Sequence, residues 1–243
     1  MRPEEAYSYR SFEHHKRETF VLIARVLNQL PGELQILDLG CGPAVFEGIA
    51  QSLTKGRISK AWLLDIEPGF LRYAETQLSG IIPSIVTAEF DMNRPATLPH
   101  IDSPFSAVVS VNALFHATKA TLTEIYRYCY EHLCDGGILV NHQTFGSPAE
   151  RLIDTYCPFL DSKALQDPLD AELLRRSHLD TKKAGGAVNK DGVGGYQGLV
   201  MTAHEHLDIL REAGFVAEEV WRKGKSAIIL GEKPANKTAG GDA

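Results

Sequence analysis

The stretch that decides the fold is ILDLGCGPAV, residues 36–45. An apolar run ends near Asp38, and Gly40 and Gly42 then flank Cys41 before an apolar, helix-like segment begins. In an open α/β sheet, ligands bind beyond the carboxyl ends of the strands, where the strand order reverses. Glycine allows unusual torsions there and lets a ligand approach the main chain closely. The stretch therefore predicts a buried strand, a ligand-binding turn and a helix, in that order.

Apolar strands alternate with amphipathic helices on both sides of this stretch. The pattern predicts helices at 12–30, 45–53, 69–78 and 121–133, and strands at 34–39, 61–66, 83–90, 105–111 and 138–145. Thr121 and Glu124 have capping-box spacing at the start of the fourth helix, and Gly136-Gly137 are expected to stop it. Five strands alternating with helices imply a parallel sheet covered on both faces.

Regular order stops after the fifth strand and returns near the C-terminus. Thr202 and Glu205 predict a second capping box, which opens a helix at 203–214. The last two apolar segments, 215–223 and 226–233, are joined by only a few residues, so they must pair antiparallel. We expect an α/β, Rossmann-like, seven-stranded and mostly parallel sheet with an antiparallel C-terminal strand. Helices should cover both faces, with a helical and loop insertion after strand five.

Composition excludes several classes of protein. The chain has 243 residues, 44% hydrophobic and 23% charged, which is ordinary for a globular protein. Its net charge is −6 without a lysine–arginine cluster, so a nucleic-acid partner is not expected. The N-terminus is polar and no apolar run reaches about 20 residues, so neither a signal peptide nor a membrane span is predicted. The four cysteines lack metal-ligand spacing and the histidines lack a matching acid, so no metal site is expected.

Acidic residues end two further strands. Asp65 ends the second strand, where a carboxylate can accept both hydroxyls of a ribose, and Ile66 beside it can pack on a base. Asp91 follows the third strand, where it can accept from an exocyclic amine. The dinucleotide pattern GxGxxG would need glycine or alanine at Val45. A nucleoside-containing ligand without a pyrophosphate fits this pattern better, because Asp38 would be badly placed beside phosphates.

These segments resemble the class I S-adenosylmethionine-dependent methyltransferases of the small-molecule type. The segments that match are ILDLGCGPA, LLDIEPGFLRYAE, AEFDMN, FSAVVSVNALFHA, LCDGGILV and HEHLDILREAGF. They span about residues 35–231, apart from 147–200. One departure is Ala44, where the family often has a third glycine. Alanine is small enough for the cofactor still to bind.

The resemblance implies S-adenosyl-L-methionine as the cofactor and assigns its site. Asp38 would meet the amino group of the methionine part, Asp65 the ribose, and Asp91 with the Met92 amide the adenine. Asn112 would lie near the methionine end. The full set of expected cofactor residues is Asp38, Gly40, Cys41, Gly42, Asp65, Ile66, Asp91, Met92 and Asn112.

Methyl transfer is an in-line displacement that positioning alone can accelerate, and a base is needed only if the acceptor must lose a proton. His116, just past the fourth strand, is the first candidate for that base, and His142, at the end of the fifth, is the second. Tyr9 and Phe12 are the candidates for an aromatic lid that contacts the substrate.

The expected organisation has five parts. These are an N-terminal helical lid (1–34), a cofactor-binding Rossmann-like core (35–146), a substrate-covering insertion (147–200), completion of the core (201–233) and a disordered tail (234–243). We expect a cytoplasmic monomer or homodimer that methylates oxygen or nitrogen of a small molecule. Three alternatives stay open: a tRNA-modifying enzyme, an enzyme that uses the cofactor without transferring methyl, and a pseudoenzyme that only binds it.

Overall fold

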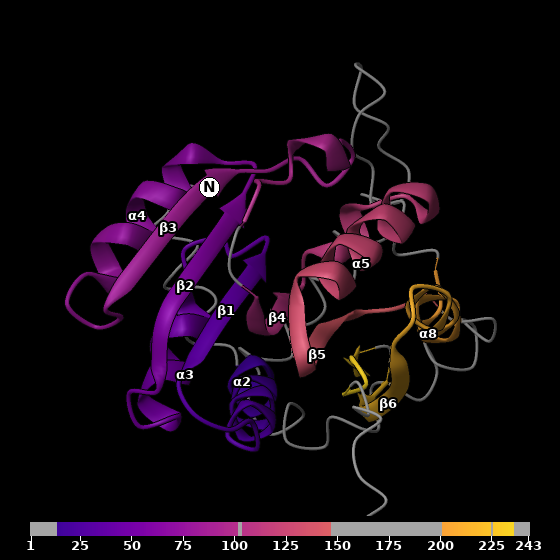
Figure 1. Cartoon of the computed structure of the whole chain (residues 1–243), viewed down its shortest axis with the longest axis horizontal. Coiled ribbons are helices and arrows are strands. Elements are labelled where there is room, and N and C mark those ends of the chain that lie inside the picture. Colours follow the sequence, from indigo (N-terminus) through magenta and orange to yellow (C-terminus); the bar gives the residue numbers. More distant parts are fainter. Residues whose placement is uncertain (1–13, 102–103, 147–200, 225, 236–243) are drawn as a thin grey trace, which may run out of the picture.

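A seven-stranded sheet forms the centre of the molecule. The computed structural model describes residues 14–101, 104–146, 201–224 and 226–235. Residues 14–17 are described by their backbone alone. The strands are β1 (Leu34–Leu39), β2 (Ile58–Asp65), β3 (Ser84–Glu89), β4 (Phe105–Val111), β5 (Leu133–Thr144), β6 (Val216–Lys223) and β7 (Ser226–Glu232). Their order is β3-β2-β1-β4-β5-β7-β6 (Figure 1). Only β7 runs against its neighbours, because it pairs antiparallel with both β5 and β6. The predicted fold class is confirmed.

Helices cover both faces of this sheet. Helices α2 (His14–Leu27), α3 (Val45–Leu53) and α4 (Pro68–Leu78) pack on one face, and α5 (Lys119–His132) and α8 (Ala203–Glu212) pack on the other. The alternation of strand side chains divides the core accordingly. Ile36 of β1 packs with the α2–α4 side, whereas Leu37 packs with the α5–α8 side. Two short 3₁₀ helices, η1 (Pro95–Thr97) and η2 (Leu114–His116), follow β3 and β4.

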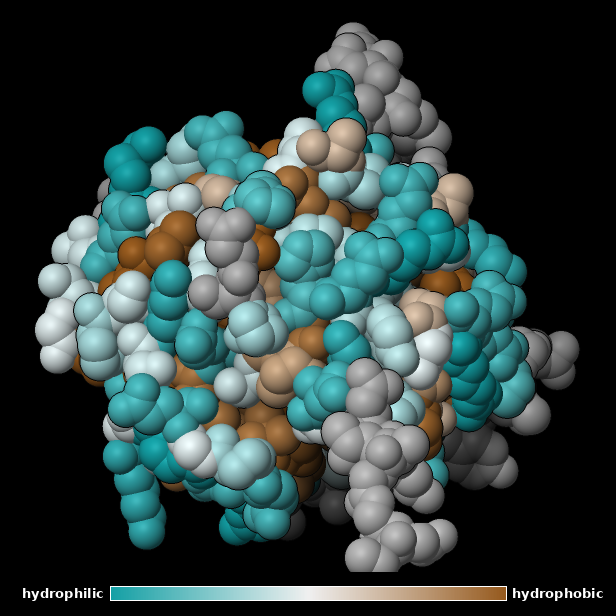
Figure 2. All heavy atoms as spheres, viewed as in Figure 1, coloured by the Kyte–Doolittle hydropathy of each residue, from teal (hydrophilic) through white to brown (hydrophobic). Residues whose placement is uncertain are grey.

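The surface of the molecule carries the residues that are not buried in these two core layers. The face seen in Figure 2 is mostly hydrophilic, and apolar atoms show only in smaller areas between polar ones. Within the described part of the chain, no helix is both long and apolar enough to cross a bilayer. Among the large apolar side chains that the structure describes, Ile66, directly after β2, has the highest exposed fraction, at 62%.

The region from α5 to β5 differs from the sequence prediction in two respects. The predicted capping box of Thr121 and Glu124 is wrong: Thr118 is the N-cap of α5, and its side chain accepts from the amide of Thr121. The expected stop at Gly136-Gly137 is also wrong, because α5 already ends at His132 and both glycines lie inside β5. Backbone hydrogen bonds of 2.9 Å join them to Lys233, which extends the pairing beyond β7. A distant strand, invisible in the local pattern, thus lengthens β5.

The chain reverses its direction across the sheet between β1 and β4. It runs outward from β1 through β2 to β3 and then returns to β4, which pairs parallel with the other side of β1. The crossovers from β1 and β4 therefore leave to opposite faces, which opens a crevice at their carboxyl ends. This is the position that the glycine stretch occupies.

The long segment after β5 leaves and rejoins the core at one place. The amide of Gly146 donates to the carbonyl of Met201 at 2.8 Å, and Gly146 pairs with Thr202 in an isolated bridge. The predicted capping box of Thr202 and Glu205 is confirmed and begins α8 there. Residues 147–200 themselves lie outside the described residues.

Candidate functional site

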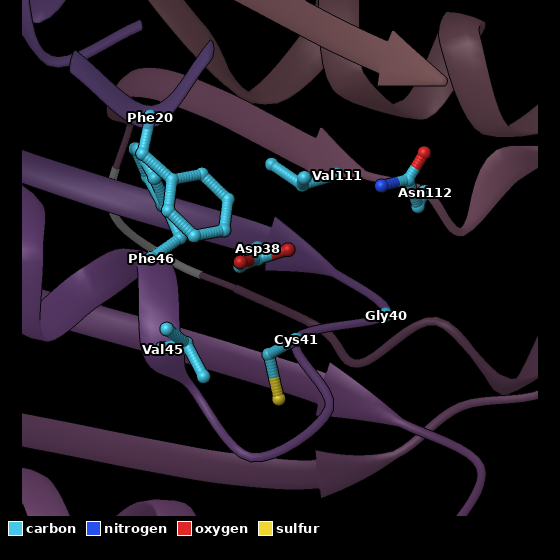
Figure 3. Close-up of a pocket in the computed structure, with 8 residues that line it drawn as sticks. All are labelled: Phe20, Asp38, Gly40, Cys41, Val45, Phe46, Val111 and Asn112. Carbon is cyan, nitrogen blue, oxygen red and sulfur yellow. The ribbon is translucent and has the colours of Figure 1, made fainter. Parts of the chain in front are cut away.

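A cavity lies beyond the carboxyl ends of β1 and β4, where the crevice is expected. It opens to solvent, and about 340 Å³ of space, part of it open solvent, lies between its walls. Its lining comes from α2, β1, the glycine loop, α3 and the end of β4 (Figure 3): Phe20, Asp38, Gly40, Cys41, Val45, Phe46, Val111 and Asn112. The sequence prediction placed Asp38, Gly40, Cys41 and Asn112 in one site, and the structure brings all four together.

Asp38 is the one acid of this lining. It sits on β1 two residues after Ile36, so its side chain faces the α2–α3 side of the sheet. The side chain is 2% exposed, and its carboxylate lies at the centre of the lining residues in Figure 3. A buried carboxylate stabilises a positively charged group far more than a neutral or negative one. The cavity is therefore suited to a ligand that carries a cation.

The glycine loop, residues 40–44, uses its amides inside the protein. Gly40 and Cys41 donate to the carbonyl of Leu64 at 2.7 and 3.0 Å, and Ala44 donates to the carbonyl of Cys41 at 3.1 Å. Pro43 has no amide hydrogen, and the amide of Gly42 donates to Asp65. A phosphate cradle needs such amides to point at the ligand. This loop thus offers close approach of the backbone but not a phosphate site.

Asp65 holds two loops together. Its Oδ2 accepts from the amide of Gly42 at 2.8 Å, and its Oδ1 accepts from the amide of Glu67 at 2.9 Å. The first bond fixes the loop after β1 and the second fixes the turn into α4. A carboxylate has about four acceptor sites, so these bonds leave room for the two hydroxyls of a ribose. The predicted binding residue therefore also organises the site.

Glycine is required at position 40 by the packing of the protein itself as well as by the close approach of a ligand. Its φ is +81°, a conformation that side chains rarely adopt. A methyl group at this position would collide with the side chain of Ala113 and lie 2.9 Å from Cε of Met92. The sequence indicated only that glycine lets a ligand approach the main chain, whereas the nearest obstacle to a side chain at this position is the core itself.

The expected adenine-side residues lie on the loop after β3. Asp91 accepts from the amide of Asn93 at 2.9 Å and pairs with Arg94 at 3.5 Å. The side chain of Met92 is buried, and its Cε lies beside Gly40. Among the described residues, the Met92 amide has no acceptor, although the amides of the residues on both sides donate within the protein. That amide is available to a ligand, in line with its predicted role.

Asn112 directly follows β4 and has a strained backbone conformation. Its φ is +55°, in the left-handed region, and its amide donates to the carbonyl of His142 at 2.7 Å. A non-glycine residue in this region costs about 1–3 kcal/mol and occurs most often at functional sites. Together with its place in the cavity lining, this supports the prediction that Asn112 contacts the ligand.

The two candidate bases have different surroundings. His116 ends η2 and is exposed, and its ring lies tilted against that of Phe115, with centroids 4.2 Å apart and an interplanar angle of 43°. His142 is 2% exposed, and its Nε2 lies 2.9 Å from Oγ of Ser226. Neither residue lines the cavity. Tyr9 and Phe12, the predicted substrate residues, lie outside the described residues.

Sequence reasoning missed half of the lining. Phe20, Val45, Phe46 and Val111 belong to the cavity, but in the sequence each is one apolar residue among many on an amphipathic helix or a buried strand. Only the positions of Val45 and Phe46, directly after the glycine loop, could have indicated their role. As for metals, the described ranges hold no group of three or more histidine, cysteine, aspartate or glutamate side chains that could bind one.

Comparison with known proteins identifies the class to which this site belongs. Residues 36–137 match a family model described as a methyltransferase domain. No curated protein matches the sequence of the chain. The resemblance to the class I S-adenosylmethionine-dependent methyltransferases is confirmed: the chain carries a methyltransferase domain on the fold of that superfamily.

Solved structures agree on the fold. The S-adenosylmethionine-dependent methyltransferase SibL is 18% identical with a TM-score of 0.55, and the alignment covers 90% of this chain and 56% of that one. The CurJ carbon methyltransferase is 14% identical with a TM-score of 0.62, covering 95% and 58%. Human N-acetylserotonin methyltransferase, in complex with SAM, is 18% identical with a TM-score of 0.60, covering 96% and 55%. The chain thus spans little more than half the length of these structures.

Proposed function

We propose that this chain binds S-adenosyl-L-methionine in the cavity beyond β1 and β4 and transfers its methyl group to oxygen or nitrogen of a small molecule. The observation that carries the proposal is the buried carboxylate of Asp38 beside a glycine loop without free amides. This combination favours an amino group and disfavours a pyrophosphate. The methyltransferase domain at residues 36–137 supports the same cofactor.

The residues present fit the parts of that cofactor. Asp38 would hold the ammonium group. The first-turn amides of α3, at Val45 and Phe46, would receive the carboxylate, because the N-cap residue Ala44 provides no side-chain cap for them. Asp65 would accept from the ribose hydroxyls, because a carboxylate oxygen can accept more than one hydrogen bond.

The base end of the nucleoside would lie across the loops after β2 and β3. The exposed side chain of Ile66 offers an apolar surface for adenine, and covering it would remove most of its 62% exposure from water. The available amide of Met92 can donate to a ring nitrogen, and Asp91 can accept from the exocyclic amine if its contact with Arg94 loosens.

The chain's own contribution to the chemistry is positioning and the handling of one proton. When bound, S-adenosyl-L-methionine supplies an electrophilic methyl group on a sulfonium centre. Asp38, Asp65 and the glycine loop fix the donor for in-line attack. His116 is the better-placed base, because its exposed ring can take a proton from an O–H or N–H acceptor and pass it to water. His142 is the weaker candidate, because Ser226 occupies its Nε2.

The remaining parts of the proposal concern organisation. We assign residues 1–34 to a lid and 147–200 to a substrate cover, around a core of 35–146 completed by 201–233. We also propose a cytoplasmic monomer or homodimer. Cys129 and Cys134 form no disulfide, which suits a reducing compartment.

Calorimetry tests the cofactor site. S-adenosylhomocysteine, the demethylated cofactor, should bind the wild-type chain at one site, whereas NAD should not bind measurably. Asp38→Asn should weaken binding of S-adenosylhomocysteine strongly, and Asp208→Asn, a matched change at an exposed acid on α8, should leave it unchanged. Tight binding of NAD, or equal affinity in the wild type and the Asp38→Asn variant, would contradict the proposal.

A further inference from the structure

We propose that Phe20, on the helix that precedes the sheet, is a ligand-binding residue: with Phe46 it forms an aromatic wall that holds the ligand's amino group against Asp38. The inference rests on the proposed function of this cavity and deepens it. It extends the site beyond residues 36–137, which match the methyltransferase domain. It also gives α2 a role in ligand recognition that its amphipathic pattern does not reveal.

Phe20 and Phe46 meet at the wall of the cavity. Their ring centroids are 5.7 Å apart with an interplanar angle of 59°, and both side chains line the cavity while being only 3% exposed. In Figure 3 both lie beside the carboxylate of Asp38, although they come from different helices. The two rings therefore form one continuous apolar surface next to the buried acid.

The chemistry of this wall complements an ammonium group. Of the eight lining residues, Asp38 is the single charged one, and the wall beside it is aromatic. The face of an aromatic ring attracts cations by about 0.5–1 kcal/mol in water and about 2 or more when water is excluded. A cation between the rings and Asp38 would gain from its charge with both partners, whereas a neutral group of the same size would gain no charge attraction from either.

The contribution of Phe20 can be separated from the docking of its helix. The turn that follows α2 is anchored independently, because the Arg57 guanidinium donates to the carbonyls of Leu30 and Gly32, the latter at 2.9 Å from Nε. The side chain of Asn28 also donates to the carbonyl of Leu53 at 3.0 Å. A conservative change at Phe20 should therefore leave α2 in place.

Core packing is the competing explanation, since Phe20 also belongs to the hydrophobic cluster on this face of the sheet. Two ligands distinguish the roles: S-adenosylhomocysteine and its desamino analogue, which differ only in the amino group. A packing defect would weaken both ligands alike. Loss of a cation site would weaken only the one that carries the amine.

The experiment is calorimetry on the full chain with both ligands. In Phe20→Leu we expect the dissociation constant of S-adenosylhomocysteine to rise about tenfold and that of the desamino analogue to change less than about twofold. Phe46→Leu should act in the same direction. Val26→Ala, a half-buried apolar change on the same helix but outside the cavity, is the matched control and should alter neither ligand.

Two results would overturn the inference. One is equal weakening of both ligands in Phe20→Leu, which would make Phe20 a packing residue. The other is unchanged affinity for S-adenosylhomocysteine. If the wild-type chain binds neither ligand, the proposed function itself fails, and that outcome is seen before any variant is compared.

Discussion

The amide of Gly42 donates a hydrogen bond of 2.8 Å to Oδ2 of Asp65, which joins the glycine loop after β1 to the acid that ends β2. Gly42 follows β1 and Asp65 ends β2, and because these neighbouring strands are parallel, their carboxyl ends meet at the same edge of the sheet. The other oxygen of Asp65 holds the turn into α4 through the amide of Glu67. The site is therefore organised before a ligand arrives, and the residue expected to bind the ribose is also structural.

This dual role gives the first prediction. Asp65→Ala should cost about 2–4 kcal/mol of affinity for S-adenosylhomocysteine, because charge-assisted hydrogen bonds to the ribose are lost. It should also lower the free energy of unfolding without ligand by about 1–3 kcal/mol, because two amides lose their acceptor. Calorimetry and urea denaturation measure the two effects. Asp208→Ala, which removes an exposed ion pair with Arg211, should change stability by less than about 1 kcal/mol. Unchanged ligand binding in a folded Asp65→Ala variant would remove Asp65 from the site.

The second prediction compares two glycines with positive φ. Gly40→Ala should lower the free energy of unfolding by about 2–4 kcal/mol, because strain at φ +81° adds to the collision with Ala113 and Met92. Gly32 has a φ of +65°, but a methyl group there would have no atom within 4 Å. Gly32→Ala should therefore lower the free energy of unfolding only by the backbone strain, about 1–2 kcal/mol. Denaturation curves of the two variants measure the difference. Equal losses would show that Gly40 is not packed against the core.

The third prediction concerns pH and His206 of α8. Burial lowers the pKa of His206 from 6.5 to about 4, and its Nδ1 lies 2.9 Å from the Tyr126 hydroxyl. Below pH 6.5, His206 binds a proton in the unfolded chain but stays neutral in the folded chain until the pH approaches 4. The contribution of this histidine to stability is therefore complete above pH 6.5 and declines by up to about 1.4 kcal/mol per pH unit as the pH falls toward 4.

Urea denaturation between pH 4 and 7 measures that slope. His206→Gln should remove this part of the pH dependence, while His204→Gln, an exposed change on the same helix, should keep it. If the slope of His206→Gln matches that of the wild type, the buried histidine is not its source.

The fourth prediction tests the base. If His116 takes the proton of the acceptor, His116→Ala should lower kcat by roughly 10²- to 10⁴-fold with nearly unchanged affinity for the cofactor. The acid limb of the pH–rate profile should disappear with it. His116→Asn keeps a hydrogen bond but cannot act as a base near neutral pH, so it should be almost as slow. Recovery of most of the rate in His116→Asn would mean that the residue only positions the acceptor.

Much of the fold could be predicted because local signals and packing agree. The bounds of β4 and α3 match the prediction residue for residue, and the capping box of Thr202 and Glu205 is present. Strong periodicity, with a clear start signal, leaves little for tertiary contacts to change. The start of β5 was predicted five residues late, because its first part is defined by pairing with β4 and with Lys233 rather than by its own composition.

The residues of the site also fall into some that could be predicted from the sequence and some that could not. The acids and glycines at strand ends could be predicted because polar and small residues there contrast with the apolar strands before them. Phe20 and Phe46 could not, because an apolar side chain that lines a cavity looks in sequence like one that fills the core. Asp65 was found, but its bond to Gly42 was not, since it depends on the spacing of two loops.

Methyl transfer itself is the most direct test of the central claim. The purified chain is incubated with trideuteromethyl-labelled S-adenosyl-L-methionine and a small-molecule extract, and mass spectrometry follows every labelled product, with Asp38→Asn as the inactive control. The account predicts at least one small molecule that gains the labelled methyl group only with the wild-type chain, together with S-adenosylhomocysteine in equal amount. Cofactor that binds but is never consumed with any small-molecule extract, or label that appears only in added tRNA, would contradict it.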